Sequence, residues 1–171
     1  MQEKQRAGFK MRILVDSSTL IALARIGKLD VLKTVFENVY ITTMIKKEIL
    51  KEESPDAEAF KEAIHQWIHV IEYKGNPVEL KKYGMDSGEA SLFLAAQSND
   101  RLILDETNAR RFAEAKGLKF TGLIGLIVAA VRAGKLTREE GLEVINKLAM
   151  GDFRVKLELY LWAQEEIERT C

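Results

Sequence analysis

Met11-Arg12-Ile13-Leu14-Val15-Asp16 is a short apolar run that finishes on an acid. A second stretch of the same form is Arg101-Leu102-Ile103-Leu104-Asp105. Both have the length and composition of buried strands. In an open α/β sheet, ligands bind outside the carboxyl ends of the parallel strands. The two stretches therefore predict a sheet that carries Asp16 and Asp105 at its ligand-binding edge.

Alternating strand and helix patterns extend outward from these two stretches. Three further strands are expected at residues 39–41, 70–73 and 119–121, and helices near 20–26, 29–37, 54–67, 86–97, 107–116 and 123–134. A helix after Thr42 carries Glu48, and Thr137 with Glu140 has the spacing of a capping box that opens another. Residues 74–85 contain glycines and a proline, so they predict a long loop that could act as a lid. The fold class is α/β, with a mostly parallel sheet covered on both faces.

Length and composition limit the other possibilities. The chain has 171 residues, which favours one domain, and its 26 basic residues equal its 26 acidic ones, so it has no bulk positive field. No apolar run approaches the roughly 20 residues that cross a bilayer, and the single cysteine excludes a disulfide framework. We expect no membrane association, a cytoplasmic location, a flexible leader at residues 1–10, a core at 11–134 and a C-terminal helical extension at 135–171 that packs on the core or on a partner.

Four carboxylates stand where apolar sequence gives way to polar sequence: Asp16, Glu48, Glu89 and Asp105. Acids brought into one crevice repel each other unless protons or cations intervene, so their coincidence favours a bound divalent metal ion and a metal-dependent hydrolase. Basic residues accompany them. Lys46 and Lys47 precede Glu48, and Arg110 and Arg111 follow Asp105, which indicates either local phosphate binding or solvated helix faces.

Each acid also has a structural interpretation. Asp16 and Asp105 could cap the helices that follow them, and Asp86 with Glu89 has the spacing of a capping box. Glu48 could be an exposed helix residue paired with a lysine. The four-residue spacing of His65 and His69 leaves zinc binding on one helix face as a weaker alternative. The apolar helix at 123–131 is either core or a dimer face.

Two other classes of site are disfavoured. Strand one is followed by Ser17-Ser18-Thr19 and not by a glycine-rich loop, which argues against dinucleotide or Walker-type nucleotide binding. Phosphatases with an aspartyl nucleophile need an aspartate two residues after the first, and Ser18 occupies that place. A receiver-like or phosphatase-like domain is therefore also disfavoured.

Four blocks of the chain together resemble the PIN-domain nucleases: 15–21, 45–49, 88–95 and 102–110. The resemblance spans roughly Met11 to Gly134. Residues 86–89 and 121–125 are particularly like a prokaryotic branch related to the toxins of VapBC-type toxin–antitoxin pairs. Where many relatives have an aspartate shortly after the last acid, this chain has Glu106 and Asn108.

The resemblance implies a three-layer α/β/α sandwich with an acidic pocket that holds Mg²⁺ or Mn²⁺. It also implies cleavage of single-stranded RNA by a toxin or an RNA-processing enzyme, with a small antitoxin and a second copy of the chain as partners. Catalytic and metal-binding roles fall on Asp16, Glu48, Glu89 and Asp105, auxiliary roles on Ser18, Asp86, Glu106 and Asn108, and contacts with the RNA backbone on Lys46, Lys47, Arg110 and Arg111. The alternative is a weakly catalytic or non-catalytic module of the same fold that binds RNA or protein.

Overall fold

The structure is a computed structural model that describes residues 11–51 and 54–170, so the expected leader at 1–10 lies outside the described residues. Within them, the chain forms a parallel sheet of five strands in the order β3-β2-β1-β4-β5. The strands are β1 (Ile13–Val15), β2 (Val39–Thr42), β3 (Ile68–Ile71), β4 (Arg101–Ile103) and β5 (Lys119–Thr121). Ile13 of β1 is in register with Val39 on one side and with Arg101 on the other.

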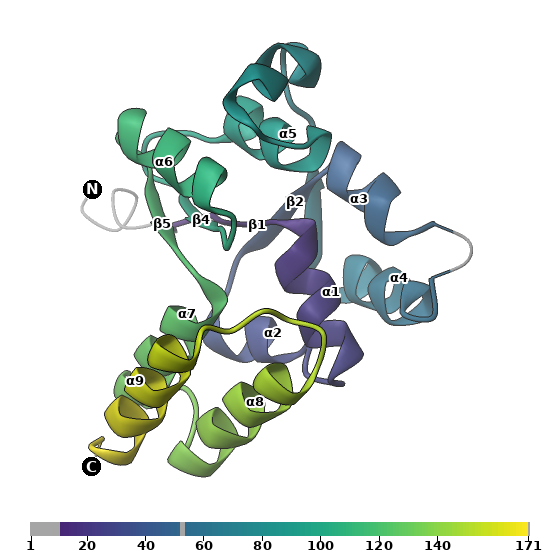
Figure 1. Ribbon diagram of the computed structural model, residues 1–171. Helices are drawn as coiled ribbons and strands as arrows, with labels where there is room; N and C mark the ends of the chain where they lie inside the picture. The colour runs from purple at the N-terminus through teal and green to yellow at the C-terminus, as the bar shows by residue number, and fades with distance from the viewer. Residues whose placement is uncertain (1–10, 52–53, 171) are drawn as a thin grey trace, which may run out of the picture.

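Helices cover both faces of this sheet, as the sequence predicts. The helices are α1 (Ser17–Arg25), α2 (Val31–Val35), α3 (Thr43–Ile49), α4 (Ala57–Gln66), the 3₁₀ helix η1 (Pro77–Tyr83), α5 (Ser87–Ala95), α6 (Thr107–Ala115), α7 (Leu123–Arg132), α8 (Arg138–Met150) and α9 (Leu157–Glu168). In Figure 1, α5 and α6 lie on one side of the strands and α1 and α2 on the other. The three-layer α/β/α sandwich is therefore confirmed.

The strand order places a reversal point between β1 and β4. From β1 the chain moves outward to β2 and β3, and then crosses to β4 and moves outward the other way to β5. In sheets of this kind the helices on the two sides of the reversal leave opposite faces, and a crevice opens at the carboxyl ends of the two central strands. The residues of β1 are completely buried, because both faces of the sheet are covered there.

The expected loop at residues 74–85 is wrong, because most of it forms η1 and packs against α5. The Asn76 side chain accepts a hydrogen bond from the Val78 amide at 3.1 Å, and Pro77 occupies the first helical position. Gly84 ends the helix in the left-handed conformation, with a φ of +79°. These are ordinary helix-end signals, so the segment expected to act as a lid forms an ordered 3₁₀ helix.

Two other local predictions are corrected. The helix expected from Ser54 begins at Ala57, since the Ser54 hydroxyl accepts a hydrogen bond from the Asp56 amide in a turn that precedes the helix. The zinc alternative fails because His65 lies on α4 whereas His69 lies on β3 and stacks on Tyr40, with ring centroids 4.9 Å apart.

The C-terminal helices α8 and α9 pack against α7 and against each other. Val144 and Ile167 belong to the same buried cluster as the sheet residues, and α7 is mostly buried, so its apolar surface is core and not a free dimer face. A Cβ on Gly141 would come within 2.4 Å of a Val131 methyl group, which shows how closely α8 approaches α7. Among the described residues, no helix combines the length and apolar character needed to span a bilayer.

Candidate active site

The candidate site lies at the reversal point of the sheet. Asp16 directly follows β1, and Asp105 follows β4 by two residues. The backbone joins the two segments, because the Asp16 amide donates a hydrogen bond to the Ile103 carbonyl oxygen at 3.3 Å. The two apolar runs of the sequence therefore deliver their terminal acids to one edge, as predicted.

Asp16 is held rigidly but left with one free oxygen. It is the N-cap of α1, and its Oδ1 accepts a hydrogen bond from the Thr19 amide at 2.9 Å. Its Oδ2 is buried and has no hydrogen-bond partner in the part of the chain that the structure describes. The side chain is 2% exposed, and burial together with the charge of Asp105 raises its pKa to about 6, against the opposing influence of the polar groups of Thr19 and Ser18.

Glu89 is positioned by the first turn of α5. Its carboxylate accepts a hydrogen bond from the Asp86 amide at 3.1 Å, and the Asp86 carboxylate accepts one from the Glu89 amide at 2.8 Å, which is the predicted capping box. Burial, together with the negative charges of Asp86, Asp16 and Glu106, raises the pKa of Glu89 to about 7, against the hydrogen bond from the Asp86 amide. Capping and a place in the acidic site are thus compatible roles.

A cavity of about 210 Å³ brings these acids together. Its wall consists of Asp16, Ser17, Ser18, Gly84, Asp86, Glu89, Glu106 and Asn108. We call it the acidic pocket. All four residues to which sequence reasoning gave auxiliary roles therefore line it, beside two of the four predicted catalytic acids.

Asp105 stands behind the wall of the acidic pocket. Its Oδ2 accepts a hydrogen bond from the Thr19 hydroxyl at 3.0 Å, and its Oδ1 accepts one from the Leu123 amide at 3.1 Å. Burial raises its pKa, while Leu123, Thr19 and Arg110 oppose that shift. The capping role suggested for Asp105 on the helix at 107 is wrong, because Glu106 holds that position and Asp105 receives the first amide of α7.

Glu48 reaches the site from α3 and lies against the backbone of α5. A Cβ on Gly88 would come within 2.5 Å of a Glu48 carboxylate oxygen, so only glycine permits this approach. Burial raises the pKa of Glu48, whereas hydrogen bonds from the Ser17 hydroxyl and the Gly88 amide lower it. Glu48 is not part of the wall of the acidic pocket, but it lies against Ser17, which lines the pocket, and against Gly88.

The predicted basic residues differ in their surroundings. Arg110 donates hydrogen bonds to the Leu104 carbonyl oxygen at 2.9 Å and to Asp105 at 3.4 Å, so its guanidinium helps to hold the acid. Lys46, Lys47 and Arg111 have exposed side chains.

Sequence reasoning missed two residues that organise the site. Thr19 donates through its amide to Asp16 and through its hydroxyl to Asp105, so it joins the two strand-end acids. Ser91 bonds the Gly88 carbonyl oxygen at 2.6 Å and also the Thr42 hydroxyl at 2.6 Å, which fixes α5 against the strand end of β2. The position of Thr19, three residues after a capping aspartate, is the only sequence signal for either role.

Whether the acids can hold a cation depends on how their side chains are arranged and on the charges around them. Among the described residues, no group of three or more carboxylate, imidazole or thiol side chains is arranged to hold a metal ion. The buried Asp16 Oδ2 nevertheless has no hydrogen-bond partner among the described residues, and the charged residues that line the pocket with it are all acids, so a proton or a cation would offset its charge. A hard cation that keeps several waters needs only one or two direct carboxylates, so this donor set fits such an ion.

Comparison with known proteins gives the family. No curated protein and no solved structure matched the chain. A family model described as PIN domain matches residues 12–169, which include α8 and α9 and so extend beyond Gly134. Because this match covers nearly all of the chain, the chain belongs to the PIN-domain family.

Proposed function

We propose that this protein is a divalent-metal-dependent endoribonuclease of the cytoplasm that cleaves single-stranded RNA. PIN domains are generally nucleases that use divalent metals. The observation that carries the proposal is the buried Asp16 Oδ2, which has no hydrogen-bond partner among the described residues and belongs to a side chain that lines a pocket with further acids.

The residues that line the pocket have two proposed roles. Asp16 and Glu89 would hold Mg²⁺ or Mn²⁺ directly, and Asp86, Glu106 and Asn108 line the same space and would bind its waters. Such an ion lowers the pKa of a water molecule and offsets the charge that develops on phosphate oxygens. Attack of water on phosphorus with loss of the 3′ oxygen leaves a 5′-phosphate and a 3′-hydroxyl.

The residues around the pocket hold the acids and the substrate. Asp105 and Glu48 support the site from behind, the first through Thr19 and the second through Ser17 and Gly88. Exposed Lys46, Lys47 and Arg111 would bind phosphates of the RNA backbone, and Arg110 would keep Asp105 in place.

The test is cleavage of end-labelled single-stranded RNA by the purified protein in Mn²⁺ or Mg²⁺, beside an EDTA control and the Asp16→Asn variant. Cleavage that requires metal, yields 5′-phosphate ends and disappears in the variant is the expected result. Equal cleavage by both proteins would identify a contaminating nuclease and count against the proposal.

A second candidate is a PIN-fold module that binds RNA without hydrolysing it. It is favoured by the absence, among the described residues, of a ready-made cluster of three metal ligands. RNA binding without metal-dependent cleavage would select this candidate.

Proposed partners follow from the family, since PIN nucleases often pair with antitoxins. A toxin role predicts growth arrest on expression and release from arrest by a small neighbouring protein. A homodimer is the second proposed partner, and light scattering of the purified protein would detect it. Harmless expression of an active nuclease would leave an RNA-processing role in place of the toxin role.

A further inference from the structure

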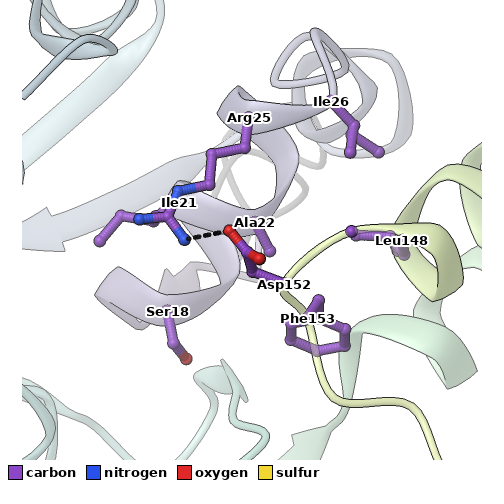
Figure 2. A pocket seen from close by; sticks show the side chains of 9 residues that line it. Ser18, Ile21, Ala22, Arg25, Ile26, Leu148, Asp152 and Phe153 are labelled. Carbon is purple, nitrogen blue, oxygen red and sulfur yellow. Dashed lines mark hydrogen bonds and ion pairs between the residues drawn. The ribbon is translucent and has the colours of Figure 1, made fainter.

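A second cavity, of about 460 Å³, opens beside the acidic pocket. Its walls are one face of α1 and the end of α8 with the segment that follows it, as Figure 2 shows: Ser18, Ile21, Ala22, Arg25, Ile26, Leu148, Gly151, Asp152 and Phe153. We call it the α1 groove. Ser18 lines both the α1 groove and the acidic pocket, so the two cavities adjoin at the first turn of α1.

The direction of the α1 groove follows from helix geometry. Ser18, Ala22 and Arg25 are spaced by four and three residues, so they lie on one face of α1. With a rise of about 1.5 Å per residue, the seven steps from Ser18 to Arg25 cover about 10 Å. The groove therefore begins at the acidic pocket and leads away from it along two turns of the helix.

The chemistry of the groove combines an apolar slot with a cation. Leu148 is buried, and Ile21 and Phe153 are partly buried, so the slot can cover an apolar ring. The Arg25 guanidinium stands at the slot, where its ion pair with Asp152 spans 3.5 Å and both side chains are more than half exposed, at 55% and 86%. Exposed ion pairs of this kind contribute little to stability, so Arg25 can exchange its partner for another anion.

A nucleotide has the matching parts. Its base is a flat ring that stacks on aromatic side chains, and its phosphate is an anion that arginine binds well. We propose that the α1 groove binds the base of a nucleotide adjacent to the scissile phosphate, with Phe153 against the ring and Arg25 on a flanking phosphate. The inference rests on the proposed RNA substrate, and it places the substrate strand along α1. Stacking is possible with every base, so the groove supplies affinity and not sequence choice.

The test measures binding in EDTA, where no cleavage is expected, by fluorescence anisotropy with two labelled probes. One probe is a single-stranded RNA oligonucleotide, and the other is an abasic ribose-phosphate chain of the same length. The intact protein should bind the RNA about 10-fold more tightly than the abasic chain, because stacking of one base is worth about that factor.

Variants separate the two contacts. Phe153→Leu keeps an apolar side chain and should remove the preference for the base-containing probe, whereas Phe153→Tyr should retain it. Arg25→Ala should weaken the binding of both probes. It should also reduce the slope of log affinity against log salt concentration by about 0.7, the loss expected for one phosphate contact on a single strand. The matched controls are Trp162→Leu, a partly exposed aromatic residue on α9, and Arg169→Ala, whose exposed ion pair with Glu165 lies at the C-terminal end of α9. Both controls should bind both probes as the intact protein does.

Three results would overturn the inference: equal affinity of the intact protein for the two probes, an unchanged preference in a folded Phe153→Leu variant, or no binding of either probe. Capture of an apolar peptide by the groove in a protein that ignores both probes would point to a protein partner instead. Failure of the nuclease proposal is separable, because Asp16→Asn should lose cleavage while keeping the preference for bases.

Discussion

Two aspartates at opposite ends of adjacent strands are equally buried but differ in their hydrogen-bond and ion-pair partners. Asp100 immediately precedes β4 and Asp16 immediately follows β1, and each is 2% exposed. The Asp100 carboxylate accepts hydrogen bonds from two nitrogens of Arg12, at 2.9 and 2.6 Å, and from the Gln97 amide at 2.7 Å. Asp16 receives the Thr19 amide on one oxygen, and its charged neighbours are other acids.

The two ends of the sheet treat a buried carboxylate differently. Burial of a carboxylate is costly unless a partner offsets its charge. At the amino end of β4 the protein supplies that partner in Arg12, whereas at the carboxyl end of β1 it supplies none among the described residues. We interpret Asp100 as a structural residue and Asp16 as a candidate cation ligand.

The largest expected effect separates the two acids by activity. Asp16→Asn should reduce metal-dependent cleavage by about 100-fold or more, because outer-shell changes in metal sites already cost about 10- to 100-fold and Asp16 is proposed as a direct ligand. Asp100→Asn should leave the rate of the folded protein unchanged. Rates of both variants, normalised to the folded fraction by circular dichroism, check the prediction, and a similar loss in both would erase the distinction.

The second effect is on the free energy of unfolding, where Asp100 should matter more than Asp16. Asp100→Asn should lower the free energy of unfolding by about 2 to 3 kcal/mol, since it leaves the partly buried Arg12 guanidinium without its carboxylate partner. Asp16→Asn breaks no ion pair and should not share this loss. Urea unfolding in EDTA at neutral pH measures both, and an Asp100→Asn protein as stable as the parent would contradict the scaffold role.

A third, smaller effect tests the link between the strand-end acids. Thr19→Val removes the hydroxyl that donates to Asp105 at 3.0 Å while it keeps the amide that donates to Asp16. Activity should fall by about 10-fold, the lower end of outer-shell effects in metal sites. Thr43→Val, a change of the same type at the start of α3, serves as control. A Thr19→Val enzyme with full activity would mean that Asp105 needs no such support.

The smallest effect is a pH dependence of stability without metal. The pKa of Asp16 is raised from 3.8 to about 6 and that of Glu89 from 4.5 to about 7. Between about pH 4 and 7 the folded protein therefore binds more protons than the unfolded chain, and the free energy of unfolding falls as pH rises. In EDTA, Asp16→Asn should be more stable than the parent at pH 8, and this gain should shrink toward zero as the pH falls to 4. Thermal unfolding at both pH values checks this, and a gain that is the same at both would show that the titration of Asp16 is not its cause.

Much of this arrangement could be predicted because it depends on local sequence. Apolar runs that end on Asp16 and Asp105 fix two central strands, and the spacing of Asp86 and Glu89 fixes the start of α5. The same kind of local signal predicted the capping box at Thr137. These features follow from hydrogen bonds within a few residues, so they survive whatever packs around them.

The rest depends on how distant elements meet. Glu48 and Asp105 stand behind the pocket because Gly88 admits one carboxylate and the Leu123 amide attracts the other, and both contacts cross between elements. The α1 groove arises where the segment around Phe153 returns to α1, which no local pattern encodes. The glycines and proline of residues 74–85 predict a loop, but Pro77 and Gly84 mark the two ends of a helix and do not interrupt one.

The most direct test of the central claim is calorimetric titration of the protein with Mn²⁺ at pH 7.5, compared with Asp16→Asn and Asp100→Asn. We expect saturable binding by the parent and by Asp100→Asn and a loss of that binding in Asp16→Asn. Binding of equal strength by Asp16→Asn would contradict the claim that the unpartnered carboxylate at the end of β1 exists to hold a cation.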